Sequence, residues 1–82
     1  MNIQAIFNSN DLVGKLRNGA YALPDDATVE TLMEIAELEA GIELTEQQKS
    51  NFVFVFDNKP AFYDTKLLDG GKLRVMYKIL GG

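Results

Sequence analysis

The sequence contains no cysteine and no histidine. The absence of cysteine excludes disulfides and thiolate nucleophiles, and the absence of both excludes zinc sites of the usual Cys/His type and the common general base near neutral pH. Serine occurs only at Ser9 and Ser50, and no histidine is present to activate either one as in a catalytic triad. We therefore expect no catalytic residues, and a small enzyme ranks last among the functions considered.

Long hydrophobic runs and excess positive charge are also missing. No apolar stretch approaches the roughly 20 residues that a membrane span needs, and the first residues, MNIQAIF, lack the features of a signal peptide. The 8 basic and 12 acidic residues give a net charge of −4, which disfavours nonspecific binding to nucleic acid phosphates. We expect a cytoplasmic protein whose partners include neither nucleic acid nor membrane.

The 82 residues, 46% of them hydrophobic, suffice for one small domain. We expect a single domain over residues 1–82, with residues 79–82 as a flexible C-terminal tail. The region from Asp25 to Glu46 carries eight acids and no base, and its simplest interpretation is a solvated helix face. The acids Asp11, Asp25 and Asp26 lack the spacing of a calcium-binding loop, so no metal site is expected.

Alternating apolar residues predict several strands. Residues 2–7 form one strand, and its hairpin partner is expected within residues 15–23. Residues 52–56, F-V-F-V-F, are apolar on both faces, which is typical of an inner strand or of a strand whose outer face meets a partner. Residues 57–60 are expected to turn the chain.

A helix is expected over residues 29–40. Thr28 can cap its first turn by accepting a backbone N–H bond, and Gly41 supplies the left-handed residue that ends it. The apolar stripe that should lie on the core comprises Val29, Leu32, Met33, Ala36 and Ala40. Leu38 points the other way, and Thr45 is positioned to cap a second, short helical turn.

A last strand is expected over residues 72–79. Before it, Leu67 and Leu68 should plug one end of the core and residues 69–71 should form a turn. The order strand, strand, helix, strand, strand predicts an α+β domain, in which one main helix packs on one face of a mixed sheet of four to five strands. The other face of the sheet is then left open.

This open face is a candidate docking surface for a partner protein. Apolar side chains ringed by charge favour transient docking, because the apolar centre supplies affinity and the charges steer an acidic partner. The predicted docking residues are Phe54, Lys72, Arg74, Met76 and Lys78. The alternative is that these lysines are ordinary solvated side chains.

The pair Gly81-Gly82 follows the last predicted strand almost directly. Glycine has no Cβ, so such a tail can enter a narrow channel in another protein and present a terminal carboxylate to chemistry there. Gly82 would carry the reactive carboxylate, while Gly81 and Leu80 would thread the channel. The alternative is an ordinary disordered terminus.

Several short motifs together resemble those of a known family. These are I-F-N-S-N-D-L-V-G near the start, A-T-V-E-T-L at residues 27–32, D-x-x-L-x-D-G at residues 64–70 and the terminal Gly-Gly. In this combination the chain resembles the ubiquitin-like β-grasp sulfur carriers (MoaD/ThiS-like), and most of all the molybdopterin synthase small subunit. It differs from that pattern at Tyr77-Lys78, where a proline pair is usual, and at Gly71, where a second acid is usual.

The resemblance implies a ubiquitin-like β-grasp fold and a role as a carrier without catalytic residues. It implies that an E1-like adenylating enzyme docks on the open face and uses ATP and magnesium to convert the Gly82 carboxylate to an acyl-adenylate. A sulfur donor protein would then form a thiocarboxylate that delivers sulfur in molybdenum cofactor biosynthesis or, as a second choice, the thiamine pathway. A synthase large subunit would be a further partner, and the chain itself would bind no cofactor.

Two other functions fit the same residues. A ubiquitin-like protein modifier would pass the activated Gly82 to a lysine instead of accepting sulfur. A noncovalent β-grasp interaction module would make no use of the glycines. The acceptor of the activated carboxylate distinguishes the sulfur carrier from the protein modifier. An absence of ATP-dependent modification would indicate the noncovalent module.

Overall fold

The computed structural model describes residues 1–8 and 15–78. Its elements, in chain order, are β1 (Asn2–Phe7), β2 (Gly19–Ala22), α1 (Val29–Ala40), α2 (Glu46–Ser50), β3 (Phe52–Phe56), β4 (Lys59–Ala61) and β5 (Lys72–Tyr77). The predicted α+β class, with one main helix and a mixed sheet, is confirmed. No helix in the described part of the chain is long and apolar enough to cross a membrane.

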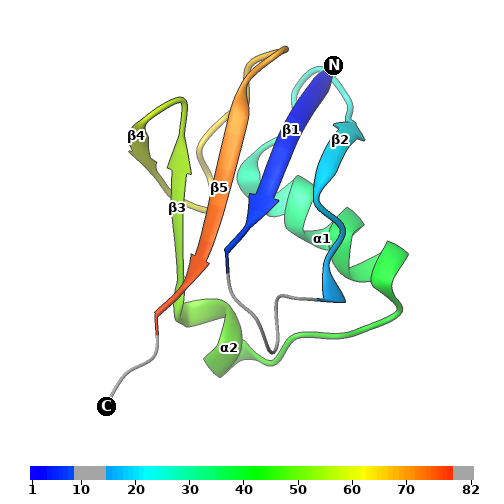
Figure 1. Ribbon diagram of the computed structural model, residues 1–82, viewed down its shortest axis with the longest axis vertical. Helices are drawn as coiled ribbons and strands as arrows, with labels where there is room; N and C mark the ends of the chain where they lie inside the picture. The colour runs from blue at the N-terminus through cyan, green and yellow to red at the C-terminus, as the bar shows by residue number, and fades with distance from the viewer. Residues whose placement is uncertain (9–14, 79–82) are drawn as a thin grey trace.

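The five strands form one sheet in the order β2-β1-β5-β3-β4 (Figure 1). β1 and β5 are parallel, and the other neighbouring pairs are antiparallel. β5 therefore occupies the centre of the sheet, although it comes last in the chain. The expected hairpin between residues 2–7 and a strand within residues 15–23 is confirmed, as is the inner position of β3.

The core lies between α1 and one face of the sheet. On β1 the alternation is as predicted, with Ile3, Ala5 and Phe7 buried. The side chains of Leu73 and Val75 on β5 meet them from the central strand and are fully buried. Burying this apolar surface is the main stabilising contribution to a fold of this size.

The bounds of α1 follow from its caps. The Thr28 hydroxyl accepts the Thr31 backbone N–H at 3.4 Å, and the Thr31 hydroxyl accepts the Thr28 N–H at 3.1 Å, which satisfies two amides that the helix leaves unpaired. Gly41 ends the helix in the left-handed conformation (φ 69°). Four residues of the predicted stripe are buried, and the fifth, Ala40, is half-buried at the end of the helix.

Two local predictions were wrong. Leu67 is buried as expected, but Leu68 is 68% exposed. Successive side chains of an extended segment point in opposite directions, so only one of the two leucines can face the core. The hydrogen bond from the Leu67 N–H to the Ala27 carbonyl fixes Leu67 as that residue. β5 ends at Tyr77 rather than at Ile79, which lies outside the described residues.

The turn after β3 is tighter than the predicted 57–60. The turn consists of Asp57 and Asn58 alone. Both have positive φ (49° and 67°), as a two-residue hairpin turn requires to match the twist of its flanking strands. Residues 59–61 can therefore pair with β3 as β4, which lies at the edge of the sheet, where Pro60 is tolerated.

Candidate functional site

The sheet face opposite α1 carries most of the predicted docking residues. The side chains of β5 alternate, so that Leu73 and Val75 enter the core while Lys72 and Arg74 are exposed and Met76 is half-buried. Strand register places apolar residues from three other strands beside them.

Residues that pair directly across a sheet have their side chains on the same face. Arg74 pairs with Ile6 of β1 on one side and with Val55 of β3 on the other. Val53 pairs with Met76 and is 43% exposed. We define the open face by its outward residues: Ile6, Val53, Val55, Pro60, Lys72, Arg74 and Met76. It is an apolar surface crossed by two cations of the central strand.

Phe54 does not belong to this face, and its prediction as a docking residue was wrong. It is 4% exposed, pairs with the buried Val75 and Ala61, and stacks edge-on against Tyr63 with the ring centroids 4.8 Å apart. Because side chains alternate along a strand, the outward residues of β3 are Val53 and Val55. The signal was present in the sequence, since three phenylalanines at alternate positions mark the core side of the strand.

A polar hollow of about 270 Å³ borders the open face next to the β3–β4 turn. Lys72 and Arg74 line it together with Asp57 and Asn58, and the Asp57 carboxylate accepts the Lys72 backbone N–H at 2.9 Å. Among the described residues the ion pairs are Met1–Asp25, Arg17–Glu39 and Lys49–Glu46. The two cations of β5 therefore take part in none of them.

The C-terminal end of the described chain is held by contacts with the start of β3. Lys78 is the last described residue, and it is exposed, as Lys72 and Arg74 are. Its backbone N–H donates to the Asn51 carbonyl at 2.7 Å. Just before it, the ring of Tyr77 packs edge-on against Phe52 at 5.3 Å. The predicted threading and reactive residues, Leu80, Gly81 and Gly82, lie outside the described residues. The structure places the start of their segment at the end of the central strand.

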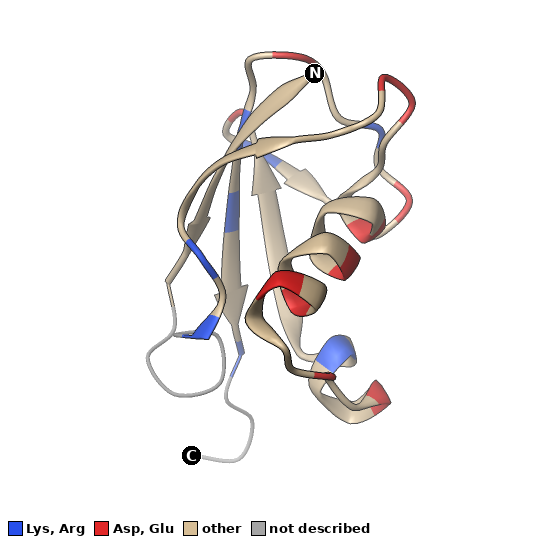
Figure 2. Cartoon of the chain, turned by 90° about the vertical axis from the view of Figure 1, so that its right-hand side faces the viewer, with Lys and Arg blue, Asp and Glu red and all other residues tan. Residues whose placement is uncertain are grey.

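Charge is separated between the two sides of the molecule. Acidic residues follow one another along α1 (Figure 2), whereas Lys72 and Arg74 belong to β5 of the sheet. One acid was misjudged from the sequence: Glu37 is not a solvated side chain but only 9% exposed. Its carboxylate accepts the Leu44 backbone N–H at 2.8 Å, so a hydrogen bond compensates its burial.

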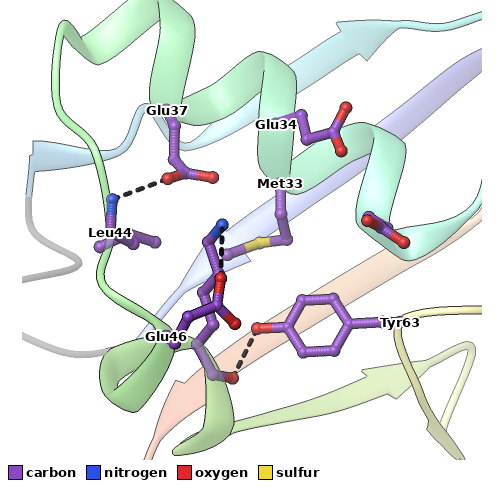
Figure 3. Close-up of a pocket in the computed structure, with 8 residues that line it drawn as sticks. Met33, Glu34, Glu37, Leu44, Glu46 and Tyr63 are labelled. Atoms are coloured by element: carbon purple, nitrogen blue, oxygen red, sulfur yellow. Dashed lines mark hydrogen bonds and ion pairs between the residues drawn. The ribbon is translucent and has the colours of Figure 1, made fainter.

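A pocket of about 210 Å³ lies between α1 and α2 (Figure 3). Glu37 and Tyr63 line it from opposite sides, and burial, together with the nearby charges of Glu37, Glu30 and Glu46, raises the pKa of Tyr63 to about 12. No group of three or more acids in residues 1–8 and 15–78 is arranged to hold a metal ion.

The order and pairing of the strands, with α1 crossing one face, define the ubiquitin-like β-grasp fold. Two crystal structures share it. SAMP1 from Haloferax volcanii superposes with a TM-score of 0.70 at 17% identity, over 100% of both chains. A second structure, of H. volcanii small archaeal modifier protein 1, gives a TM-score of 0.69 at 14% identity, over 95% of this chain and 98% of that one. No protein-family model and no curated protein matches the sequence.

Proposed function

We propose that this ubiquitin-like protein is a sulfur carrier whose Gly82 is adenylated by an E1-like enzyme and converted to a thiocarboxylate. The observation that supports this most is the position of β5. The central strand of a β-grasp sheet runs directly into the segment that contains Gly81-Gly82, and its last described amide is held by Asn51. Sulfur delivery in molybdopterin-type cofactor biosynthesis is the favoured use, and the thiamine pathway is the second.

Activation is needed because a carboxylate resists attack by nucleophiles. The Gly82 carboxylate would attack the α-phosphorus of ATP, bound with magnesium to the partner, and release pyrophosphate. The terminal sulfur of a persulfide on a donor protein would then attack the carbonyl carbon, the bond to the AMP oxygen would break, and AMP would leave. A thiol would next cleave the resulting acyl disulfide, which leaves the thiocarboxylate on Gly82 and a disulfide on the donor. The chain's own residues supply docking through the open face and a slim tail, and the partners supply the catalytic groups.

Intact-mass spectrometry tests the proposal. The first measurement is made on the untreated protein and checks that it ends in a free Gly82 carboxylate. Incubation with ATP, magnesium, the activating enzyme and a sulfur donor should then exchange one oxygen for one sulfur. Deleting Gly82 should abolish this exchange while leaving the circular dichroism spectrum unchanged. If the wild-type mass does not change in the presence of ATP, the protein is a noncovalent interaction module instead.

A protein modifier is the second candidate, and one observation favours it. The two similar structures are of a protein that carries the name small archaeal modifier protein 1. A modifier would use the same activated Gly82 but transfer it to a lysine amine. Incubation with an activating enzyme and a cell extract would then give isopeptide-linked products, which tryptic mass spectrometry detects on acceptor lysines. Thiocarboxylate without such products favours the carrier.

A further inference from the structure

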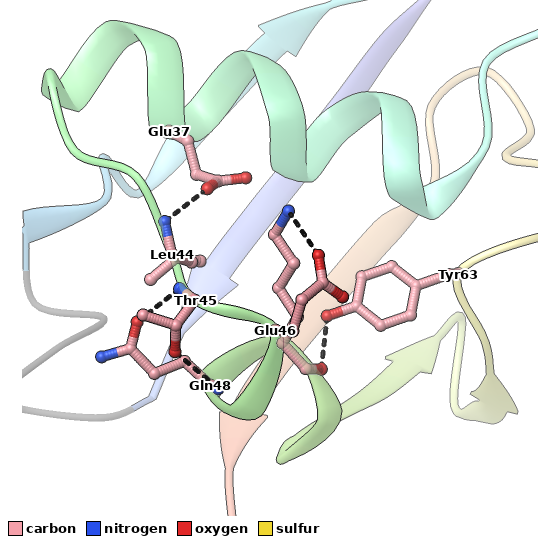
Figure 4. Close-up of polar contacts among 7 residues, drawn as sticks. Glu37, Leu44, Thr45, Glu46, Gln48 and Tyr63 are labelled. Atoms are coloured by element: carbon pink, nitrogen blue, oxygen red, sulfur yellow. Dashed lines mark hydrogen bonds and ion pairs between the residues drawn. The ribbon is translucent and has the colours of Figure 1, made fainter.

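The short helix α2 lies beside the end of β5 (Figure 4). Asn51, at its C-terminal end, donates its N–H to the Gln48 carbonyl at 3.1 Å and accepts the Lys78 N–H at 2.7 Å. Asn51 thus links the C-terminal end of α2 to Lys78, the residue that follows β5, at the position next to the paired residues Phe52 and Tyr77.

Packing alone does not hold α2 in place. The helix has five residues and none of them is buried, and a helix of about one turn is not stable by itself in water. Its Thr45–Gln48 capping box is internal and does not attach it to the rest of the domain. The attachment must come from other elements.

Two hydrogen bonds provide this attachment. At its N-terminal side, the Glu37 carboxylate of α1 holds the Leu44 amide. At its C-terminal side, the Tyr63 hydroxyl donates to the Lys49 carbonyl at 2.6 Å, which satisfies one of the carbonyls that the end of a helix leaves unpaired. The Tyr63 ring is in turn fixed against Phe54 in the core. Burial raises the pKa of Tyr63 to about 12, so its hydroxyl stays protonated and able to donate well into the alkaline range.

We propose that Tyr63 is a positioning residue for the C-terminal tail. Its hydroxyl holds α2 at Lys49, Asn51 caps the end of α2, and the Asn51 carbonyl accepts the Lys78 amide, so Tyr63 restrains the residue from which the chain continues to Gly82. This inference rests on the proposed function. It separates two tasks, because the open face docks the partner while Tyr63 aligns the segment that reacts.

The mechanical link is tested first, without any partner, on the full chain. Tyr63→Phe removes only the hydroxyl. A net hydrogen bond contributes about 0.5–1.5 kcal/mol, so amide hydrogen exchange at Lys78 should accelerate about three- to tenfold, while exchange at Leu73 in the core stays unchanged. Tyr21→Phe is a matched control, because the Tyr21 hydroxyl also donates to a backbone carbonyl, that of Arg17, at 2.6 Å, but lies on the edge strand β2. Unchanged exchange at Lys78 in Tyr63→Phe would overturn the proposal.

The functional consequence is tested by adenylation kinetics. Tyr63→Phe leaves the open face intact, so KM should stay at the wild-type value, whereas kcat should fall about three- to tenfold because the carboxylate is less often aligned with ATP. Tyr21→Phe should change neither constant. Wild-type kinetics in Tyr63→Phe despite faster exchange at Lys78 would overturn the positioning role. A wild-type chain that is not adenylated at all would instead refute the proposed function.

Discussion

At the scale of single residues, Gly71 has the least room for a side chain among the glycines that the structure describes. A Cβ at this position would overlap the ring of Phe56 and meet the Leu68 carbonyl at 3.0 Å. Its own carbonyl accepts the Gln4 amide, which ties the turn to β1. An acidic side chain at residue 71 is thus excluded by the position of a core phenylalanine.

We predict that Gly71→Ala destabilises the protein by about 1–3 kcal/mol, because the buried Phe56 ring must move to make room. Gly70→Ala is the comparison. A Cβ at Gly70 would have open space, but φ at this residue is 82°, so only backbone strain should destabilise the variant, by about 1–2 kcal/mol. Urea unfolding measures both. Gly71→Ala stability within about 0.5 kcal/mol of wild type would contradict the overlap.

Tyr63 should give the protein a distinct alkaline response. Its folded-state pKa is raised from 10.0 to about 12, so folding favours the neutral phenol. The stabilisation is fully present below about pH 10 and is lost as the pH rises toward 12. The charged residues that line the pocket with Tyr63 are Glu30, Glu34 and Glu37 of α1 and Glu46 and Lys49 of α2.

We therefore expect the free energy of unfolding to fall more steeply between pH 10 and 12 in wild type than in Tyr63→Phe. Urea titrations at stepped pH measure this difference. Tyrosines elsewhere in the chain contribute equally to both proteins and cancel. Parallel curves for the two proteins would show that Tyr63 is no harder to ionise in the folded state than in the unfolded one.

At the scale of elements, α1 stabilises the fold through one stripe of its surface. Leu32 is fully buried against the sheet, whereas Leu38, on the same helix, is 82% exposed. The two leucines have the same chemistry and the same helix propensity. Any difference between their contributions to the free energy of unfolding must come from contact with the core.

Leu32→Ala should lower the free energy of unfolding by about 2–5 kcal/mol, since it removes buried surface and leaves a cavity. Leu38→Ala should change it by no more than about 0.5 kcal/mol. Chemical denaturation monitored by circular dichroism compares the two variants. A comparable loss in both would mean that the outer side of α1 is covered in solution.

At the scale of the whole molecule, the acidic helix side and the sheet side that carries Lys72 and Arg74 face in opposite directions (Figure 2). Such a separation orients the molecule in the field of a charged partner and raises the rate of productive encounters. Lys72 and Arg74 lie at the centre of the open face, so an acidic partner surface would be drawn to that side.

Reversing both charges, Lys72→Glu with Arg74→Glu, should raise KM for the activating enzyme about tenfold at low salt, with a smaller effect at high salt where the charges are screened. Glu34→Lys on α1 is the control on the other side of the molecule and should not raise KM. Steady-state adenylation at two salt concentrations provides the measurement. An equal rise in KM for the control would show that net charge, rather than the open face, governs recognition.

Much of the layout could be predicted from the sequence because it depends on neighbouring residues. The helix over 29–40, its caps at Thr28 and Gly41, and the strands near both ends follow from local periodicity and backbone preference. The burial of Glu37 could not be read in the same way, because it depends on the Leu44 amide that lies opposite the carboxylate in space.

The sequence by itself thus determined the types and bounds of most elements, the absence of cysteine and histidine, and the diglycine at residues 81–82. Only the tertiary structure decided that β5 lies between β1 and β3, that Val53 and Val55 complete the open face, and that Tyr63 holds α2. The physical reason is the distance along the chain over which each kind of interaction acts. Local preferences act over a few residues, whereas strand order and hydrogen bonds such as Tyr63 to Lys49 join residues that meet only after the chain has folded.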